Sequence, residues 1–552
     1  MKLREWFDSG SPWVWLTAGA VSVSLFLVLG VLLLIAIRGL GYFWPTNVIE
    51  GFYEKDPNNI VRVIGEIADE EEVPILRIKN AGEQINVNTP FVSRFLIKLG
   101  NRDILGSDFQ WFLVPKISKV HYPKELMVVE RREWGNLYGY ISSVKENGQV
   151  IASGEAAWPE FQKRIDRVLE IFSRIRKIEK SEIGSINFKL EKLRLKERGL
   201  ELENKLTSEA QAQISKEKNS FKEKYNGLEQ ELARLYKDIN RDSYSVEVSD
   251  GRLVDLPLAK VVRAFQPNSM GLFAKIRHYF IKLWEFVSDE PREANTEGGI
   301  FPTIFGTVLM VLIMSIMVTP LGVIAAVYLR EYARQGLLTR LIRIAVNNLA
   351  GVPSIVYGLF GLGFFVYFLG GNIDRLFFPE ALPAPTFGTG GVMWASLTLA
   401  ILTLPVVIVA TEEGLGRIPS SIREGSLALG ATKAETLWRT VLPMASPAIM
   451  TGLILAVARA AGEVAPLMLV GVVKLAPSLP LDENFPFLHL DRKFMHLGFH
   501  IYDVGFQSPN VEAARPLVYA TALLLVLVIV ALNLTAIFIR NHLREKYRNL
   551  ES

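Results

Sequence analysis

Two ionisable residues interrupt an apolar stretch near the C-terminal end of the chain. The segment ILAVARAAGEVAPLMLVG carries Arg459 and Glu463 four positions apart, and on one continuous helix they would share a face. In a membrane span these charges lie near mid-membrane, where each costs at least ~2.5 kcal/mol and faces a bundle interior or a water-filled path. An ion pair that only fixes helix packing explains the same residues. The functional alternative is an arginine that lines an anion path and attracts anions once the pair opens.

A second stretch is too polar for a bilayer yet lies between two apolar runs. The segment EGSLALGATKAETLWRTVLP, Glu424 to Pro443, breaks at Gly430, resumes with a second helical pattern and ends at Leu442-Pro443. This pattern predicts a helix, a glycine turn and a second helix stopped by proline. Its apolar side chains could insert into a groove of a partner protein, although a simple structured loop is equally compatible; they are Leu427, Leu429, Leu437 and Trp438.

Several kinds of chemistry find no support in the residues. The sequence has no cysteine, no G-x-x-x-x-G-K-[ST] phosphate loop, no histidine pair with metal-ligand spacing and no nucleophile next to a base. The net charge of +4 is spread along the chain, which argues against nucleic acid as a partner. We therefore expect no enzymatic site and no bound cofactor. If the protein moves a solute, the energy comes from another chain.

Half of the 552 residues are hydrophobic, and they are concentrated in runs long enough to cross a bilayer. Six spans are predicted, at 13–37, 303–329, 344–369, 391–411, 448–473 and 516–539. The first has no signal-peptide cleavage site and is interpreted as a retained anchor. Basic residues gather in the links after the second and fourth spans and in the C-terminal tail, whereas the loop after the third span has only Arg375. The positive-inside rule then places both termini in the cytoplasm and residues 41–299 outside.

The large insert divides by composition. Residues 55–153 read as strands with an Asn-Gly hairpin turn, 158–240 as helix, and 243–262 as strands again. One continuous helix over 158–240 would be about 120 Å long, so an antiparallel helical hairpin within a small domain is the more economical interpretation. A spacer or docking arm without chemistry is the simplest role for it.

The segment that follows has an amphipathic pattern. One helical face gathers Leu272, Ile276, Tyr279, Phe280, Leu283 and Val287. Such a helix suits the membrane interface, or alternatively packs on the insert. The domain boundaries are then 1–40 for the tail and first span, 41–268 for the insert, 269–299 for the interfacial helix and linker, 300–540 for the membrane domain with a polar loop at 412–443, and 541–552 for a cytoplasmic tail.

The polar loop resembles the EAA loop of ABC importer permeases. The matching residues are Glu424-Gly425-Ser426, Gly430 and Leu442-Pro443. Gly425 and Ser426 stand where that family usually has alanines, and Thr440 stands where it often has isoleucine. The resemblance implies a coupling helix that docks into a cleft of an ATPase subunit.

Longer segments are similar to PstA, one of two permease families of the phosphate importer. They are GIFPTIFGTVLMVLIMSIMVTPLGVIAAVYLREYA, NNLAGVPSIVYGLFGLGFFV, ARAAGEVAPLMLVG and ARPLVYATALLLVLVIVALN. The resemblance covers the first span and nearly everything after Gly298, but not the insert. It implies an all-α polytopic membrane protein with a six-helix MetI-like bundle, to which this chain adds an α+β soluble insert.

The resemblance also implies partners and site residues. A PstC-like permease subunit, a PstB-like ATPase dimer that uses ATP and Mg, a periplasmic PstS-like binding protein, phosphate and membrane lipid are expected, in a bacterial cytoplasmic membrane. Arg459 and Glu463 match the charged pair of the phosphate path. The coupling loop maps onto Glu424, Gly425, Ser426, Gly430, Ala431, Thr432, Leu442 and Pro443. Two alternatives stay open: another oxyanion such as molybdate, tungstate or sulfate, and an envelope scaffold or signalling protein that acts through the insert.

Overall fold

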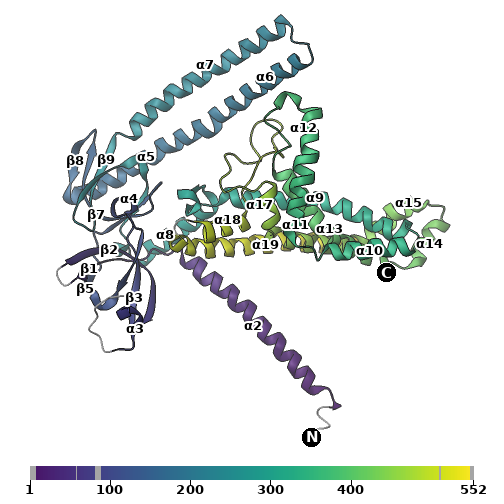
Figure 1. Cartoon of the computed structure of the whole chain (residues 1–552), viewed down its shortest axis with the longest axis horizontal. Helices are drawn as coiled ribbons and strands as arrows, with labels where there is room; N and C mark the ends of the chain where they lie inside the picture. Colours follow the sequence, from purple (N-terminus) through teal and green to yellow (C-terminus); the bar gives the residue numbers. More distant parts are fainter. Residues whose placement is uncertain (1–7, 57–58, 81–88, 509–510, 548–552) are drawn as a thin grey trace.

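The computed structural model describes residues 8–56, 59–80, 89–508 and 511–547. Figure 1 shows two sheets at one end of the molecule, a long helical hairpin that projects from them, and a bundle of apolar helices beyond. The outermost parts of the two predicted tails, residues 1–7 and 548–552, lie outside the described residues.

Among the described residues, six helical segments are long and apolar enough to cross a membrane. They are Ser11–Gly41, Phe301–Tyr332, Ser354–Phe377, Val392–Arg417, Lys433–Gly462 and Ala514–Glu545. The helices within and around them are α2 (Ser11–Gly41), α9 (Phe301–Val327), α10 (Leu337–Leu349), α11 (Ser354–Phe360), α12 (Gly371–Phe377), α13 (Val392–Arg417), α14 (Ser420–Ala428), α15 (Lys433–Thr436), α16 (Leu442–Gly462), α17 (Ala465–Val470), α18 (Leu497–Tyr502) and α19 (Val511–Tyr547). The predicted class, a polytopic six-helix membrane protein, is confirmed.

Two of the predicted spans are wrong in detail, because each is broken by the backbone. The third was expected over 344–369, with Pro353 as an irregular point, but α10 ends at Leu349 and α11 begins at Ser354. Pro353 lacks an N–H and disfavours helical geometry in the residue before it, which separates the two. The fifth was expected over 448–473, but α16 ends at Gly462. Pro466 cannot donate to the Gly462 carbonyl, four residues earlier, so the helix stops there.

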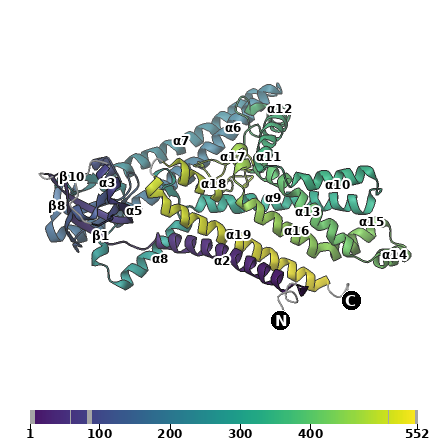
Figure 2. The same cartoon turned by 60° about the horizontal axis from the view of Figure 1, so that its bottom comes forward.

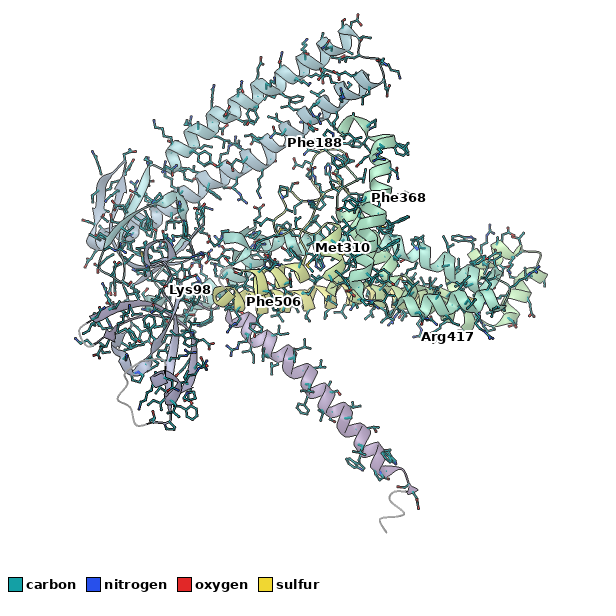
Figure 3. The ribbon with its side chains drawn as sticks, in the orientation of Figure 1. Lys98, Phe188, Met310, Phe368, Arg417 and Phe506 are labelled. Carbon is teal, nitrogen blue, oxygen red and sulfur yellow. The ribbon has the colours of Figure 1, made fainter. Side chains whose placement is uncertain are left out.

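Helix α13 is the centre of the bundle. It packs against α9 on one side and α16 on the other, and the core between them includes Met310, Leu399, Val407 and Val457. Figure 3 labels Met310 in the middle of this region. A Cβ atom on Gly452 of α16 would lie 2.8 Å from Ala410 of α13, so small residues bring the two helices together.

The insert contains two antiparallel sheets. The first has the strand order β4-β3-β2-β1-β5 and the second β10-β9-β7-β6-β11, with β8 paired to β7. The strands are β1 (Val48–Asp56), β2 (Asn59–Pro74), β3 (Phe91–Lys98), β4 (Phe109–Leu113), β5 (Ile117–His121), β6 (Met127–Arg131), β7 (Leu137–Glu146), β8 (Gln149–Ser153), β9 (Asp242–Glu247), β10 (Leu253–Pro257) and β11 (Val261–Phe265), with a small hairpin of β12 (Pro291–Arg292) and β13 (Glu297–Gly298) and short helices α3 (Ile75–Asn80) and α4 (Arg102–Leu105). The predicted Asn-Gly turn joins β7 to β8, with φ of 49° at Asn147 and 82° at Gly148.

The long helical hairpin is inserted into the second sheet, between β8 and β9. Helix α5 (Ala157–Lys177) continues through a π-helical turn, Ile178–Ile183, into α6 (Gly184–Leu202), and α7 (Ser208–Ile239) returns beside it. The two arms are joined by ion pairs such as Arg174 to Glu231, 2.9 Å apart. At its base, Phe161, Ile165 and Val168 of α5 are buried in the core of the sheet, so this end of the hairpin is part of the domain. The predicted helical hairpin is therefore present.

The outer part of the hairpin reaches back to the membrane bundle (Figure 1). Lys192 of α6 donates to the Phe485 carbonyl at 3.1 Å, and the rings of Phe188 and His489 meet edge to face at 5.5 Å. Phe485 and His489 belong to the loop between α17 and α18. The hairpin is thus a brace between the insert and a loop of the bundle.

Helix α8 (Leu272–Ser288) connects the insert to the bundle. Its exposed apolar face is formed by Phe273, Phe280 and Trp284, at 83%, 62% and 72% exposure. Tyr279 and Leu283 instead pack against the cluster around Phe43 and Phe286. The amphipathic helix is present, but the expected face is divided: Leu272, Ile276 and Phe280 are exposed, whereas Tyr279, Leu283 and Val287 pack inward.

Candidate functional site

Arg459 and Glu463 lie together at the end of α16. Arg459 Nε is 3.6 Å from Glu463 Oε1, and both side chains are partly buried. They do not share a helix face as expected, because the helix ends between them: Glu463 has extended geometry, with φ −78° and ψ 133°. The carboxylate is therefore carried by a short non-helical link, Glu463-Val464, rather than by a rigid turn.

This break lies deep in the bundle. Gly414 of α13 faces Ala448 of α16, and Ala410 faces Gly452. Continuing this antiparallel register by two turns brings Arg459 level with the middle of α13. Irregular backbone at membrane depth is found where it is buried in protein or lines a water-filled cavity. The position of Arg459 in the middle of a membrane stays a prediction.

The start of α11 lies beside the same region. A Cβ atom on Gly358 would lie 2.7 Å from Pro466 Cα, so α11 and α17 are in direct contact. Buried Tyr357 interacts electrostatically with Arg459 and donates a hydrogen bond to the Leu349 carbonyl at 2.7 Å. The hydrogen bond bridges the gap between α10 and α11. Two interrupted spans therefore converge near the Arg459 guanidinium, and a helix N-terminus such as that of α11 carries a partial positive charge.

The polar loop forms the predicted helix-turn-helix. Gly430 takes φ of +88°, a conformation that glycine adopts without steric cost. Thr432 caps the second helix: its side chain accepts from the Glu435 N–H while the Glu435 carboxylate accepts from the Thr432 N–H. This reciprocal capping box fixes where α15 begins.

The second helix of the loop does not stop at Pro443, contrary to the prediction. Helix α15 continues through a π-helical turn, Leu437–Val441, into α16. The helical segment Lys433–Gly462 is therefore continuous from the polar loop to the Arg459 break. Pro443 is tolerated because it lies in the first turn of α16, where the wider turn before it has already changed the hydrogen-bond pattern.

Three of the four apolar side chains expected to be available in the loop are exposed. Leu427, Leu429 and Trp438 are 46%, 91% and 73% exposed. Leu437 is only 4% exposed, because it packs in a core with Leu415 and Val441. The exposed apolar surface therefore lies on both sides of the Gly430 turn.

The remaining residues predicted for this loop fall into two groups. Glu424 and Gly425 are exposed on α14, with open space around Gly425. Ser426 holds the two helices together through a 2.9 Å hydrogen bond with Thr436. Ala431 and Thr432 form the turn, whereas Leu442 and Pro443 are partly buried at the start of α16. Their predicted role in coupling stays a prediction.

Sequence reasoning missed the contacts that join this loop to the link after α9. Arg423 donates to Glu331 at 2.9 Å and also to the carbonyls of Ile418 and Leu415. Lys433 bonds to the Glu331 carbonyl and lies over the Tyr332 ring. The basic residues of these links were interpreted only as orientation signals, and their partners lie about a hundred positions away in the sequence.

A second missed contact ties α10 to α13. Arg343 forms an ion pair with Glu412 at 2.6 Å and donates to the Leu329 carbonyl. These residues line a cavity of about 340 Å³ between the ends of α9, α10 and α13. Across the described part of the chain, no group of three or more His, Asp or Glu side chains is placed to hold a metal ion.

The membrane region matches known transport proteins. Residues 318–549 fit the family model "Binding-protein-dependent transport system inner membrane component". The phosphate transport system permease protein PstA 1 of Mycobacterium tuberculosis is 35% identical over 244 residues, which cover 44% of this chain and 71% of the relative. PstA of Yersinia pestis is 33% identical over 251 residues, covering 46% of this chain and 75% of the relative.

Solved structures give weaker matches. An inward-facing structure of the MetNI methionine ABC transporter is 17% identical, with a TM-score of 0.32, and covers 44% of this chain and 94% of its own. The sequence relatives, by contrast, are more than 30% identical over more than two thirds of their own length. The chain therefore belongs to the PstA family of ABC transporter permeases.

Proposed function

We propose that this permease is one of two membrane subunits that together form a path for inorganic phosphate. The observation that carries the proposal is Arg459, held next to Glu463 where α16 breaks in the middle of the bundle. A guanidinium presents several donors in a planar fork that matches phosphate oxygens. Its relatives among the phosphate transport permeases, 35% identical over 244 residues in one case, support phosphate as the substrate.

The break gives the pair a way to open. Glu463 is attached to Arg459 only through Ala460–Gly462 and a side-chain contact of 3.6 Å, longer than a close ion pair. A phosphate that arrives beside Arg459 competes with one carboxylate on a non-helical link. The positive end of α11 adds attraction for the same anion, as at other half-helices that meet substrates in transporters.

The energy comes from a separate ATPase. The exposed Leu427, Leu429 and Trp438 form a protruding apolar surface suited to a groove on a PstB-like dimer, which would bind ATP and Mg. Helices α15 and α16 are continuous from this surface to Arg459. A displacement of the loop would therefore move the end of α16 directly, without an intervening hinge.

The remaining partners and the orientation follow from the same proposal. A PstC-like subunit would complete the path, and a PstS-like binding protein would deliver phosphate on the side of the insert. The positive-inside rule places the loop with Arg417, Arg423 and Arg439 in the cytoplasm of a bacterium and the insert in the periplasm. Protease accessibility of the insert in spheroplasts tests this orientation; protection of the insert contradicts it.

Uptake of labelled phosphate at low external concentration tests the function. Cells lacking the native subunit would carry wild type, Arg459→Gln, or Arg375→Gln at equal membrane levels. Arg375 is an exposed arginine in the last turn of α12, so its variant controls for charge alone. We expect uptake in wild type and Arg375→Gln, and loss in Arg459→Gln. Uptake of molybdate, tungstate or sulfate in place of phosphate would assign the path to another oxyanion.

A further inference from the structure

A cavity of about 410 Å³ lies where the insert meets the membrane helices. Its walls come from the end of α2, the start of α19, helix α8 and strands of both sheets. Figure 3 labels Lys98, which lies at this junction. The volume falls in the range of about 300–1,000 Å³ that is usual for small-ligand pockets. None of the residues proposed for transport or coupling lines it.

The membrane side of the cavity carries two arginines. Arg38 is in the last turn of α2 and Arg515 is in the first turns of α19, and both line the cavity. The two helices touch here, because a Cβ atom on Gly39 would lie 2.9 Å from the Tyr519 carbonyl oxygen. Two guanidinium groups therefore border one opening at the end of two adjacent spans, the depth at which lipid phosphates lie.

The insert side of the cavity is rich in carboxylates. Glu66 of β2 and Glu297 of β13 line the cavity, and both interact with Lys98 of β3, as Asp108 also does. Burial raises the pKa of Glu66 and of Glu297, while those same carboxylates outweigh the effect of burial on Lys98 and raise its pKa to about 12. Lys98 is therefore shared among several carboxylates at the inner end of the cavity.

Four other charged residues that line the cavity form ion pairs. Lys282 lies 2.8 Å from Glu130, and Arg292 lies 3.0 Å from Glu285. These pairs join α8 and the β12-β13 hairpin to strand β6 and give the cavity a rigid back wall. The cationic opening and the acidic floor of the cavity are left for a ligand that carries both signs of charge.

The surroundings place this opening at the lipid surface. Before Arg38, helix α2 is exposed and apolar along most of its length. Helices α2 and α19 meet at the junction and diverge from it in Figure 1, although they overlap in the view of Figure 2. Helix α8, on the far side of the cavity, exposes Phe273, Phe280 and Trp284, as helices in a membrane interface do. Acyl chains could lie along α2 and α19 while a headgroup enters the cavity.

We propose that this cavity binds the headgroup of a zwitterionic aminophospholipid such as phosphatidylethanolamine. The phosphate lies between Arg38 and Arg515, and the primary ammonium donates to Glu66 and Glu297. The proposal follows from charge complementarity: cations at the membrane surface, carboxylates deeper, and apolar span surfaces beneath. An anionic lipid headgroup would be attracted by the arginines at the opening but would gain no ion pair with the carboxylates deeper in the cavity. A choline headgroup keeps the positive charge but has no N–H group that could donate a hydrogen bond to the carboxylates.

Native mass spectrometry of the full-length protein in detergent tests the site, with phosphatidylethanolamine, phosphatidylglycerol and phosphatidylcholine titrated separately. We expect wild type to bind the ethanolamine lipid about tenfold more tightly than either of the others. Glu66→Gln with Glu297→Gln should remove that preference and leave the affinity for phosphatidylglycerol no weaker. Arg38→Gln with Arg515→Gln should weaken all three lipids about tenfold.

Matched controls are available on the same elements. Glu72→Gln changes an exposed carboxylate of β2, and Arg540→Gln changes a partly exposed arginine towards the other end of α19; both should bind lipids as wild type does. If the Glu66→Gln, Glu297→Gln double variant does not accumulate in the membrane, the lipid affinities of Arg38→Gln alone test the proposal. Arg38 is exposed, so it can be replaced without disturbing the core. Unchanged lipid affinities in the variants, or a wild type that prefers phosphatidylglycerol, would overturn the proposal.

Discussion

Arg459 and Glu463 are four residues apart and 3.6 Å apart, yet only Arg459 belongs to the helix. A pair on one continuous helix would hold its geometry through the backbone. Here the carboxylate can move away while the arginine stays in place on α16. The arrangement therefore separates a fixed cation from a displaceable anion, which suits a path that must bind and release phosphate.

We first predict that replacing Arg459 lowers phosphate uptake more than replacing Glu463 does. Arg459→Gln should lower phosphate uptake at least about tenfold, because a hydrogen bond to a charged group contributes about 1.5–3 kcal/mol. Arg459→Lys should recover only part of it, since an ammonium lacks the planar fork. Glu463→Gln should retain more uptake than Arg459→Gln. Equal loss in Arg459→Gln and Glu463→Gln would instead indicate that the intact pair holds the bundle together.

The second prediction concerns the protruding loop. Glu424 is exposed on α14, so Glu424→Lys should leave the permease in the membrane while uptake and uptake-linked ATP hydrolysis fall together. The exposed Glu545 near the end of α19 gives a matched control in Glu545→Lys. Membrane levels, uptake and ATPase activity of the complex would be measured for both. Normal uptake in Glu424→Lys would remove the coupling role from this residue.

Third, we predict that replacing Arg423 lowers phosphate uptake more than replacing its partner Glu331. Arg423→Gln loses the ion pair and two bonds to backbone carbonyls, whereas Glu331→Gln loses only the ion pair. We therefore expect the uptake of Arg423→Gln to fall further, by several-fold relative to Glu331→Gln. Steady-state uptake at matched membrane levels measures this. The reverse order would mean that Glu331 acts through a partner other than Arg423.

The sequence predicted the membrane class well because its signals are local. Length and hydropathy mark a span, and Gly430 with the residues around it marks a turn, without knowledge of the rest of the chain. The broken spans were predicted less well. Pro353 and Pro466 were visible, but whether a proline bends or ends a helix depends on neighbours that replace its lost hydrogen bond.

Contacts between distant segments could not be predicted at all. Nothing near Glu331 indicates that it pairs with Arg423, and nothing near Lys192 indicates a contact with Phe485. The same holds for the cavity between Arg38 and Lys98, whose walls come from segments separated by hundreds of residues. Such sites arise only when the insert is docked on the bundle.

A fourth prediction is a pH dependence at the junction of insert and bundle. Burial disfavours the charged form of Glu130, but Lys282 and Arg263 outweigh it and lower the pKa of this carboxyl to about 2, below its ordinary 4.5. A carboxyl with a lowered pKa in the folded state stabilises the fold fully above its unfolded pKa. That contribution should be lost as the pH falls from about 5 towards 2.

Glu130→Gln should therefore destabilise the protein most at neutral pH. Breaking a buried pair costs about 3–5 kcal/mol, and we expect the lower end because Lys282 keeps Glu285 at 3.3 Å. Thermal unfolding between pH 7 and pH 3 measures the difference from wild type, which should shrink as the pH falls. A difference that stays constant over this range would show that Glu130 acts through packing rather than through its charge.

The last prediction separates the two parts of the helical hairpin. Its base is built into the sheet core through Phe161, whereas its outer part contacts the bundle through Phe188 and Lys192. Replacing residues 185–225 by a short Gly-Ser linker should keep the insert folded and the protein in the membrane. The loop around Phe485 would lose its brace, so its amide hydrogen exchange should accelerate at least tenfold, the effect of about 1.4 kcal/mol. Lys192→Ala with Phe188→Ala should reproduce that acceleration without shortening the hairpin, because the contacts and not the length hold the loop. Exchange as slow as in wild type would mean that the hairpin does not order the loop, and its outer part would then be free to contact another protein.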